Sequence, residues 1–155
     1  MTTRPFVRPA SVLHGLPDPV REPEFYEGVT TKRGLAWVVD ASLTFLLCLL
    51  ALPFTAFTAL FWWPFLWLMV GFLYRWATLS GGSATWGMRL MGITLRARDG
   101  GRLDPATAFA HVLGYSVSMA VFPLQLVSVA LMIVLGRGQG LTDLALGTAV
   151  INKPA

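Results

Sequence analysis

Arg33 and Asp40 combine residue types and a spacing that suit chemistry inside an apolar environment. They are seven residues apart, so on a helix they lie on nearly the same face, about 10 Å apart along the axis. Asp40 lies about four residues inside a long apolar run, where a carboxylate facing lipid costs about 2.5–3.5 kcal/mol at the bilayer centre. We therefore expect it to face protein. Asp40 then forms either an intramembrane ion or proton site, or a structural ion pair with Arg33 or with an arginine of the following loop. The structural ion pair is the commoner of the two in proteins.

The sequence offers no comparable set of residues for enzymatic chemistry. The two histidines, His14 and His111, are far apart, Cys48 is the single cysteine, and HExxH, CxxC, GxSxG and GxxxxGK[ST] patterns are absent. A lone thiol and two separated imidazoles are too few ligands for haem or an iron–sulfur cluster. We therefore expect a protein that is not an enzyme, with no catalytic residues, no metal site and no cofactor.

The composition places these residues in a membrane protein. The chain has 155 residues, of which 55% are hydrophobic and 13% charged, against about 25% charged in an average soluble chain. A soluble domain of this length has too little interior to hide so many apolar side chains. The net charge is +4, and the basic residues form no run longer than the pair Lys32–Arg33. We therefore expect them to meet anionic lipid head groups at the cytoplasmic face, and we expect no nucleic acid partner.

Two helices are predicted to cross the membrane in the first half of the chain. The 34 residues between Asp40 and Arg75 carry no charge, and roughly 20 helical residues cross a hydrocarbon core about 30 Å thick. We place the helices near 34–52 and 59–78, with the turn at Pro53. Basic residues lie before and after this pair and none lies between the helices. This pattern predicts a cytoplasmic N-terminus.

The second half is predicted to begin with a cytoplasmic loop over 79–105 and to continue with a third apolar block over 106–135. Within the loop, 90–97 and the turn at 98–101 predict a short β-like hairpin. Asp104 and Pro105 predict an N-cap and a first helical turn. The third block either crosses once with a kink at Pro123 or returns there as a re-entrant pair, because two full crossings need roughly 40 residues. A return keeps the C-terminus on the cytoplasmic side. Residues 148–151 could form a short strand.

Residues 1–31 form a polar arm that prolines interrupt, so we expect it to be extended. It is either a disordered tail or a strap laid over a partner, and it lacks the apolar core of a signal peptide. We divide the chain into this arm, a transmembrane domain over 32–152 and a tail over 153–155. The predicted fold is thus an all-α polytopic membrane protein with three apolar helical blocks, a β-like hairpin and a proline-rich arm.

Three segments of the chain resemble the signatures of the RDD family of bacterial integral membrane proteins. They are RGLAWVVD at 33–40, TWGMRLMGI at 85–93 and LTDLALGTAV at 141–150. The resemblance spans about 31–152. It implies that Arg33, Asp40 and Asp143 form a signature cluster of charged residues, structural or ion-binding. The secondary motif contains Thr85, Gly87, Arg89 and Gly92. Met88 stands where the family usually has lysine, and His111 stands where an arginine often opens the third block.

The resemblance implies a role only in outline. Members are described as possible transporters, with cation/proton antiport suggested for some, and others occur with larger partners. If Arg33, Asp40 and Asp143 cluster, Asp143 must lie on the cytoplasmic side, which favours the re-entrant path.

We prefer the hypothesis of a non-catalytic accessory subunit or factor of a larger complex in the bacterial inner (plasma) membrane. The protein would be multi-pass, with its helices packed against other integral membrane subunits and its arm docked on a partner. The alternative is a small cation/proton transporter with Asp40 and Asp143 as exchangeable carboxylates and Arg33 as counter-charge. Three or four short helices enclose little volume for alternating access, so such a transporter would have to be oligomeric.

Overall fold

The computed structural model describes residues 15–153. Predictions for 1–14 and 154–155, which include His14, the first 14 of the arm's 31 residues and the end of the tail, lie outside the described residues. The helices are α1 (Val29–Ala51), α2 (Trp63–Gly82), α3 (Trp86–Leu90), α4 (Pro105–Ala120), α5 (Phe122–Val134) and α6 (Leu141–Leu146), and the strands are β1 (Ile93–Arg96) and β2 (Ala149–Asn152). Short 3₁₀ turns cover Pro23–Phe25, Pro53–Thr55 and Thr58–Trp62.

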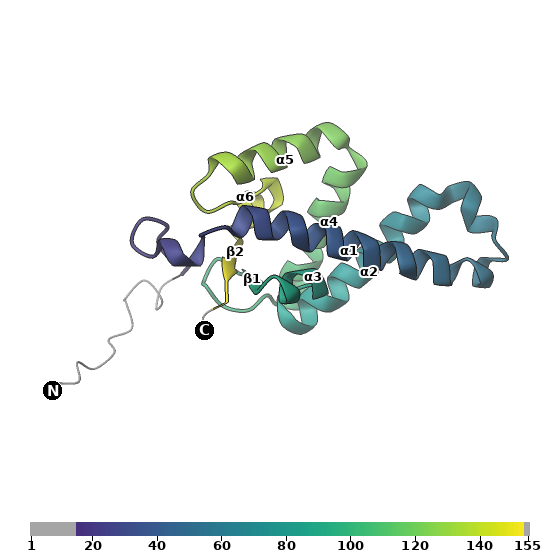
Figure 1. Cartoon of the computed structure of the whole chain (residues 1–155), viewed down its shortest axis with the longest axis horizontal. Coiled ribbons are helices and arrows are strands. Elements are labelled where there is room, and N and C mark those ends of the chain that lie inside the picture. The colour runs from purple at the N-terminus through teal and green to yellow at the C-terminus, as the bar shows by residue number, and fades with distance from the viewer. Residues whose placement is uncertain (1–14, 154–155) are drawn as a thin grey trace.

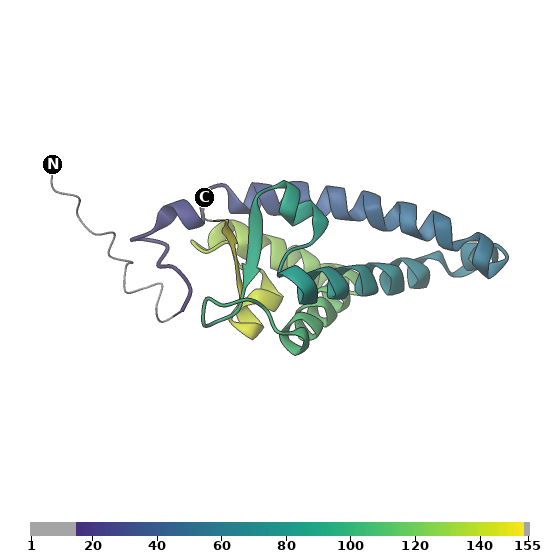
Figure 2. The ribbon, with the colours of Figure 1, turned by 90° about the horizontal axis from the view of Figure 1, so that it is seen from below.

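Helices α1 and α2 form a long antiparallel hairpin whose closed end projects from the rest of the molecule (Figures 1 and 2). α1 begins at Val29, before the predicted start near 34, because Gly28 adopts a left-handed φ of 66° and turns the chain into the helix. α2 begins at Trp63 and continues through Gly82, where the sequence predicted a loop. Ser83, with a φ of 54°, ends it by donating its N–H to the Leu79 carbonyl.

The two strands pair with each other although they lie far apart in the chain. β1 and β2 are antiparallel, with Ile93 opposite Asn152 and Arg96 opposite Ala149. This corrects the predicted β-like hairpin. The turn after β1 forms, with the Gly100 N–H bonded to the Ala97 carbonyl at 2.9 Å, but the chain then enters α4. A second unpredicted feature is helix α3, which occupies part of the segment expected to be loop.

Helices α4 and α5 form a sharply bent pair, with 117° between them. Asp104 caps α4 as predicted, because its carboxylate accepts the N–H groups of Ala106 and Thr107 at 2.9 and 3.0 Å. The break falls at Val121, and Pro123 follows in the first turn of α5, where its missing N–H is tolerated. α5 runs back toward the end of the molecule that holds the sheet (Figure 1). The chain therefore returns at the bend, and β2 reaches β1.

Apolar side chains cover the outside of the helices. Among residues 15–153, one helical segment, Pro23–Ala51, is long and apolar enough to cross a membrane, and only 22% of its most apolar window is buried. α4 and α5 meet the same criterion only as a bent pair, and α2 is not among these segments. Phe54 and Phe61, at the end of the hairpin, are 91% and 93% exposed. Asp40 and Asp143 are buried. This distribution suits a chain whose solvent is lipid.

The main core lies where the hairpin meets the sheet and α4. Its buried residues are Val29, Ala36, Leu79, Ile93, Leu95, Leu103, Ala108, Val112 and Val150. The described part of the arm packs at this end: Tyr26 contacts Ala149 and Ile151 of β2, and the Asn152 side chain donates to the carbonyls of Glu24 and Glu27. Residues 15–28 thus lie against their own chain.

Candidate functional site

The charged residues of α1 enter two separate clusters. Arg33 and Asp40 lie on one inward face of the helix, as their spacing predicted, but they do not pair with each other. Arg33 pairs with Asp143, which lies on α6, at 2.7 Å. Asp40 pairs with Arg75, which lies on α2, at 3.4 Å. The face of α1 therefore carries one charge of each sign, and each charge meets its counter-charge from a different part of the chain.

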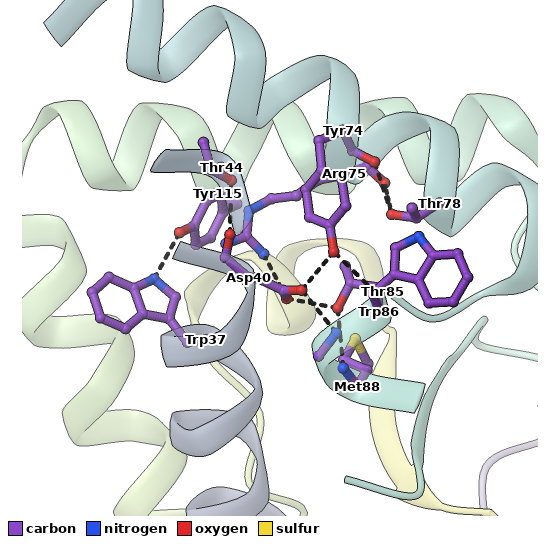
Figure 3. Close-up of polar contacts among 11 residues, drawn as sticks. Trp37, Asp40, Thr44, Tyr74, Arg75, Thr78, Thr85, Trp86, Met88 and Tyr115 are labelled. Atoms are coloured by element: carbon purple, nitrogen blue, oxygen red, sulfur yellow. Dashed lines mark hydrogen bonds and ion pairs between the residues drawn. The ribbon is translucent and has the colours of Figure 1, made fainter. Parts of the chain in front are cut away.

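Asp40 accepts hydrogen bonds from four groups (Figure 3). Its Oδ1 receives the Tyr74 hydroxyl at 2.7 Å and the Gly87 N–H at 2.9 Å. Its Oδ2 receives the Thr85 hydroxyl at 2.6 Å and the Arg75 guanidinium at 3.4 Å. An ionised carboxylate offers about four lone-pair sites. All of them are therefore used, and the carboxylate is only 2% exposed.

The short helix α3 brings two of these donors to Asp40. Thr85 is the N-cap of α3: its hydroxyl accepts the Met88 N–H at 3.2 Å and donates to Asp40. Gly87 lies so close to α1 that a Cβ there would overlap the Ala36 carbonyl and meet Asp40 Oδ1 at 2.9 Å. Only glycine allows this approach, because the backbone N–H must itself reach the carboxylate.

A polar layer continues from Asp40 to α4. The Arg75 guanidinium lies over the Tyr115 ring, 4.4 Å from its centroid, and the Tyr115 hydroxyl accepts the Trp37 indole N–H at 2.9 Å (Figure 3). A small pocket of about 20 Å³ is lined by these three side chains and by Thr44. A space of that size holds about one water molecule. The Arg75 side chain is turned inward, with 13% of it exposed.

Asp143 is the centre of the second cluster. Its Oδ2 receives the Arg33 guanidinium at 2.7 Å and the Gly140 N–H at 3.0 Å. Its Oδ1 contacts the His111 Nε2 at 2.8 Å and receives the Thr148 hydroxyl at 3.0 Å. Because an ionised carboxylate only accepts, the His111 ring carries its hydrogen on Nε2 in this contact. The cluster joins α1, α4, α6 and the segment that leads into β2.

The partners of Asp143 decide its protonation state. Burial alone would raise the pKa of this carboxyl. The Arg33 guanidinium, the His111 side chain and the Gly140 N–H outweigh burial and hold the pKa well below its ordinary value. Asp143 is therefore ionised throughout the physiological pH range.

The residues of the predicted site are thus distributed over two clusters, and some lie in neither. The structure brings Arg33 and Asp143 together and places Asp40 with Thr85 and Gly87. Two members of the secondary motif stay outside both clusters. Arg89 donates to the Ala84 carbonyl at 3.2 Å and lies over the Trp86 ring. Gly92 supplies a left-handed φ of 67° between α3 and β1.

Sequence reasoning did not assign Tyr74, Arg75 and Thr148 to the clusters. A tyrosine and an arginine late in an apolar helix were a usable signal, because a polar group at that depth needs a partner. Met88, which stands in place of the family's usual lysine, packs against the main core. His111, which stands in place of an arginine, contacts Asp143. Among residues 15–153, no three His, Cys, Asp or Glu residues gather as a metal-binding group.

The comparisons with known proteins give one match. A family model described as the RDD family matches residues 28–147. Neither the curated proteins nor the solved structures contain a significant match to this chain. The matched range includes both charged clusters except Thr148.

Gly87→Ala is predicted to lower the free energy of unfolding by about 2 kcal/mol or more, because the new Cβ forces α3 away from α1. The free energy of unfolding is measured in detergent micelles by following the loss of the helical circular dichroism signal. Gly81→Ala is the matched control: Gly81 is helical, and a Cβ at this position would have nothing within 4 Å, so we expect a gain of about 0.5–1 kcal/mol. Equal effects of the two substitutions would contradict the close contact.

Asp143→Asn is predicted to destabilise the protein by about 3–5 kcal/mol at neutral pH, because Arg33 then lies partly buried without its carboxylate. The lowered pKa means that the ionised form stabilises the fold above the ordinary carboxyl pKa, near 4, and that this contribution declines as the pH falls below it. Denaturant unfolding in micelles should therefore show a larger wild-type-to-variant difference at pH 7 than at pH 3.

The control for this titration is Asp99→Asn. Asp99 lies exposed in the turn after β1, and among residues 15–153 it has no ion pair. We expect this substitution to change the unfolding free energy little at either pH. A difference for Asp143→Asn that is the same at pH 7 and pH 3 would argue against the ion pair with Arg33.

Proposed function

Because this chain belongs to the RDD family, we propose that it is a multi-pass protein of the bacterial inner membrane that serves as a non-catalytic accessory subunit of a larger membrane complex. The observation that carries the proposal is the contrast between its interior and its surface. The buried carboxylates of Asp40 and Asp143 are saturated by donors of the same chain, whereas large apolar side chains are exposed on the α1–α2 hairpin. These features suit a protein that binds others through the exposed apolar surface of the hairpin. The buried charged groups then stabilise the fold that positions this surface.

The exposed surface at the end of the hairpin is broader than one lipid-facing helix requires. It is formed by the exposed aromatic and aliphatic residues Leu50, Phe54, Phe57, Leu60, Phe61, Trp62 and Phe65. Beneath them, Cys48, Leu52, Ala59 and Leu66 form a small core that fixes the two 3₁₀ turns. Aromatic residues held rigidly at a surface are typical anchors of protein interfaces. We therefore place the contact with another integral membrane subunit here.

The arm has a smaller part in this proposal than the sequence indicated. Residues 15–28 lie against β2 of their own chain, where Tyr26 also donates its hydroxyl to the Pro17 carbonyl at 2.8 Å. Docking of the arm on a partner stays a prediction for residues 1–14, which lie outside the described part of the chain.

We place the cation/proton transporter second. An exchangeable carboxylate needs a free oxygen lone pair and an aqueous path, yet Asp40 and Asp143 each have four donors. The pocket lined by Arg75, the ion-pair partner of Asp40, has room for about one water. These contacts favour a structural role for both residues.

The proposed topology places the α1–α2 hairpin across the membrane, α4 and α5 as a re-entrant pair, and α3, α6 and the sheet at the cytoplasmic face. Three observations support it. The sheet, the start of α1 and the end of α5 lie at one end of the molecule (Figure 2). No Lys or Arg lies between α1 and α2. The exposed side chains of α5 include Ile133 and Val134, 70% and 80% exposed, which suits contact with lipid.

Cysteine labelling tests this topology. In a Cys48→Ala background, Thr58→Cys is expected to react with a membrane-impermeant maleimide added to intact spheroplasts, because Thr58 is exposed at the outer end of the hairpin. Lys153→Cys, exposed after β2, should react only after the membrane is opened. Lysed membranes, in which both should react, are the control. Labelling of residue 153 from outside would refute the return of α4 and α5.

Site-specific photo-crosslinking tests the accessory role. A photoreactive phenylalanine analogue at Phe61 is expected to give one protein adduct of defined mass in native membranes, because this side chain is 93% exposed within the proposed interface. The same analogue at Phe122, exposed at the α4–α5 bend, is the matched control and should give lipid adducts. If both sites give only lipid adducts and the protein is recovered as a free monomer in mild detergent, the accessory role is wrong.

A further inference from the structure

A polar pocket of about 460 Å³ lies beside α6, apart from both charged clusters. This volume falls in the range of small-ligand sites, about 300–1,000 Å³. Among the described residues, two arginines, Arg98 and Arg137, line it together with Gln139. The remaining described lining comes from 15–16 and 144–147. The pocket therefore joins the described start of the chain, the turn after β1, the link between α5 and α6, and the end of α6.

The two arginines of this pocket have no carboxylate partner within residues 15–153. The Nε of Arg137 is buried and meets no hydrogen-bond acceptor there. A buried guanidinium N–H without an acceptor is unfavourable in the absence of a ligand or water. Asp18 lies within electrostatic range of Arg137, but the two side chains do not form an ion pair, and Asp18 Oδ1 accepts the N–H groups of Val20 and Arg21 at 2.8 and 3.2 Å.

The walls of the pocket position these arginines. The Arg98 side chain crosses Gly147 so closely that a Cβ there would meet Arg98 Cδ at 3.1 Å, and Gly147 has a left-handed φ of 70°. Gln139 is fixed by its side-chain bond to the Thr148 carbonyl at 2.6 Å. Arg137 lies three residues after the end of α5, whose last residues, Ile133 and Val134, are exposed and apolar. The pocket therefore lies at the boundary between the apolar helices and the polar end of the molecule.

We propose that this pocket binds a phosphate group, with the guanidinium groups of Arg98 and Arg137 as its donors. Arginine presents a planar fork of N–H groups that matches phosphate oxygens, and two such forks suit one dianionic or diester phosphate. The phosphate belongs either to the head group of an anionic phospholipid or to a soluble phosphate compound. The exposed apolar end of α5 favours the lipid. The proposal is independent of the accessory role, because it rests on other residues.

Two binding measurements on the purified full chain separate the sources. In the first, the protein is released from nanodiscs of phosphatidylcholine with or without phosphatidylglycerol, and retained lipid is counted by native mass spectrometry. In the second, the thermal unfolding midpoint in neutral detergent is measured against inorganic phosphate and pyrophosphate. Retained phosphatidylglycerol identifies a lipid site, whereas a saturable rise of the midpoint with soluble phosphate identifies a soluble ligand.

Arg98→Gln and Arg137→Gln are expected to weaken binding about tenfold or more in whichever arm is positive, because each removes charge-assisted hydrogen bonds. Arg137→Lys keeps the charge but lacks the Nε–H, so we expect an intermediate loss. Arg102→Gln is the matched control: Arg102 is exposed nearby and does not line the pocket. Arg98 is also exposed, so its variant keeps the test decisive if Arg137→Gln does not fold. No binding in either arm, or equal binding by Arg98→Gln and Arg102→Gln, overturns the proposal.

Discussion

The structure depends on one constraint: a carboxylate removed from water must be surrounded by donors. Asp40 meets the constraint through donors from α2 and from the start of α3. Asp143, on α6, meets it through contacts with Arg33 of α1 and His111 of α4. Because these donors come from distant parts of the chain, satisfying two carboxylates is enough to define the topology. The bend between α4 and α5 follows, since only a returning chain can place Asp143 beside Arg33.

The two clusters also account for the buried charged groups in a molecule whose helices carry many exposed apolar side chains. In lipid, apolar side chains gain little from association, so helices are held together by close packing and by hydrogen bonds. Gly87 supplies the close approach, and Thr85 and Tyr74 supply the hydrogen bonds at Asp40. The exposed aromatic residues at the end of the hairpin are then free to meet lipid or another subunit. The family membership and the apolar α1 are in keeping with this arrangement.

Several local signals in the sequence were reliable, although the end of α2 and the short helix α3 were not predicted. Asp104 and Pro105 marked the start of α4, and the residues around 148–151 predicted β2. The common inward face of Arg33 and Asp40 followed from their spacing. The long-range pairing of the strands was not predictable in the same way. β1 was assigned to a hairpin because the turn that follows it is local, whereas its actual partner, β2, reaches it only because α5 returns. The assignment of Arg33 to Asp143, and of Asp40 to Arg75, likewise depends on how four helices meet.

The pairing of β1 with β2 has a consequence for biosynthesis. β1 leaves the ribosome well before β2, so its hydrogen-bonding edge stays open while α4 and α5 are being synthesised. The last strand then completes the core around Ile93 and Leu95 and, through Asn152, fastens residues 24–27. The sheet therefore closes only after α4 and α5 have been made, and the nascent chain presents an unpaired strand to chaperones and proteases in the interval.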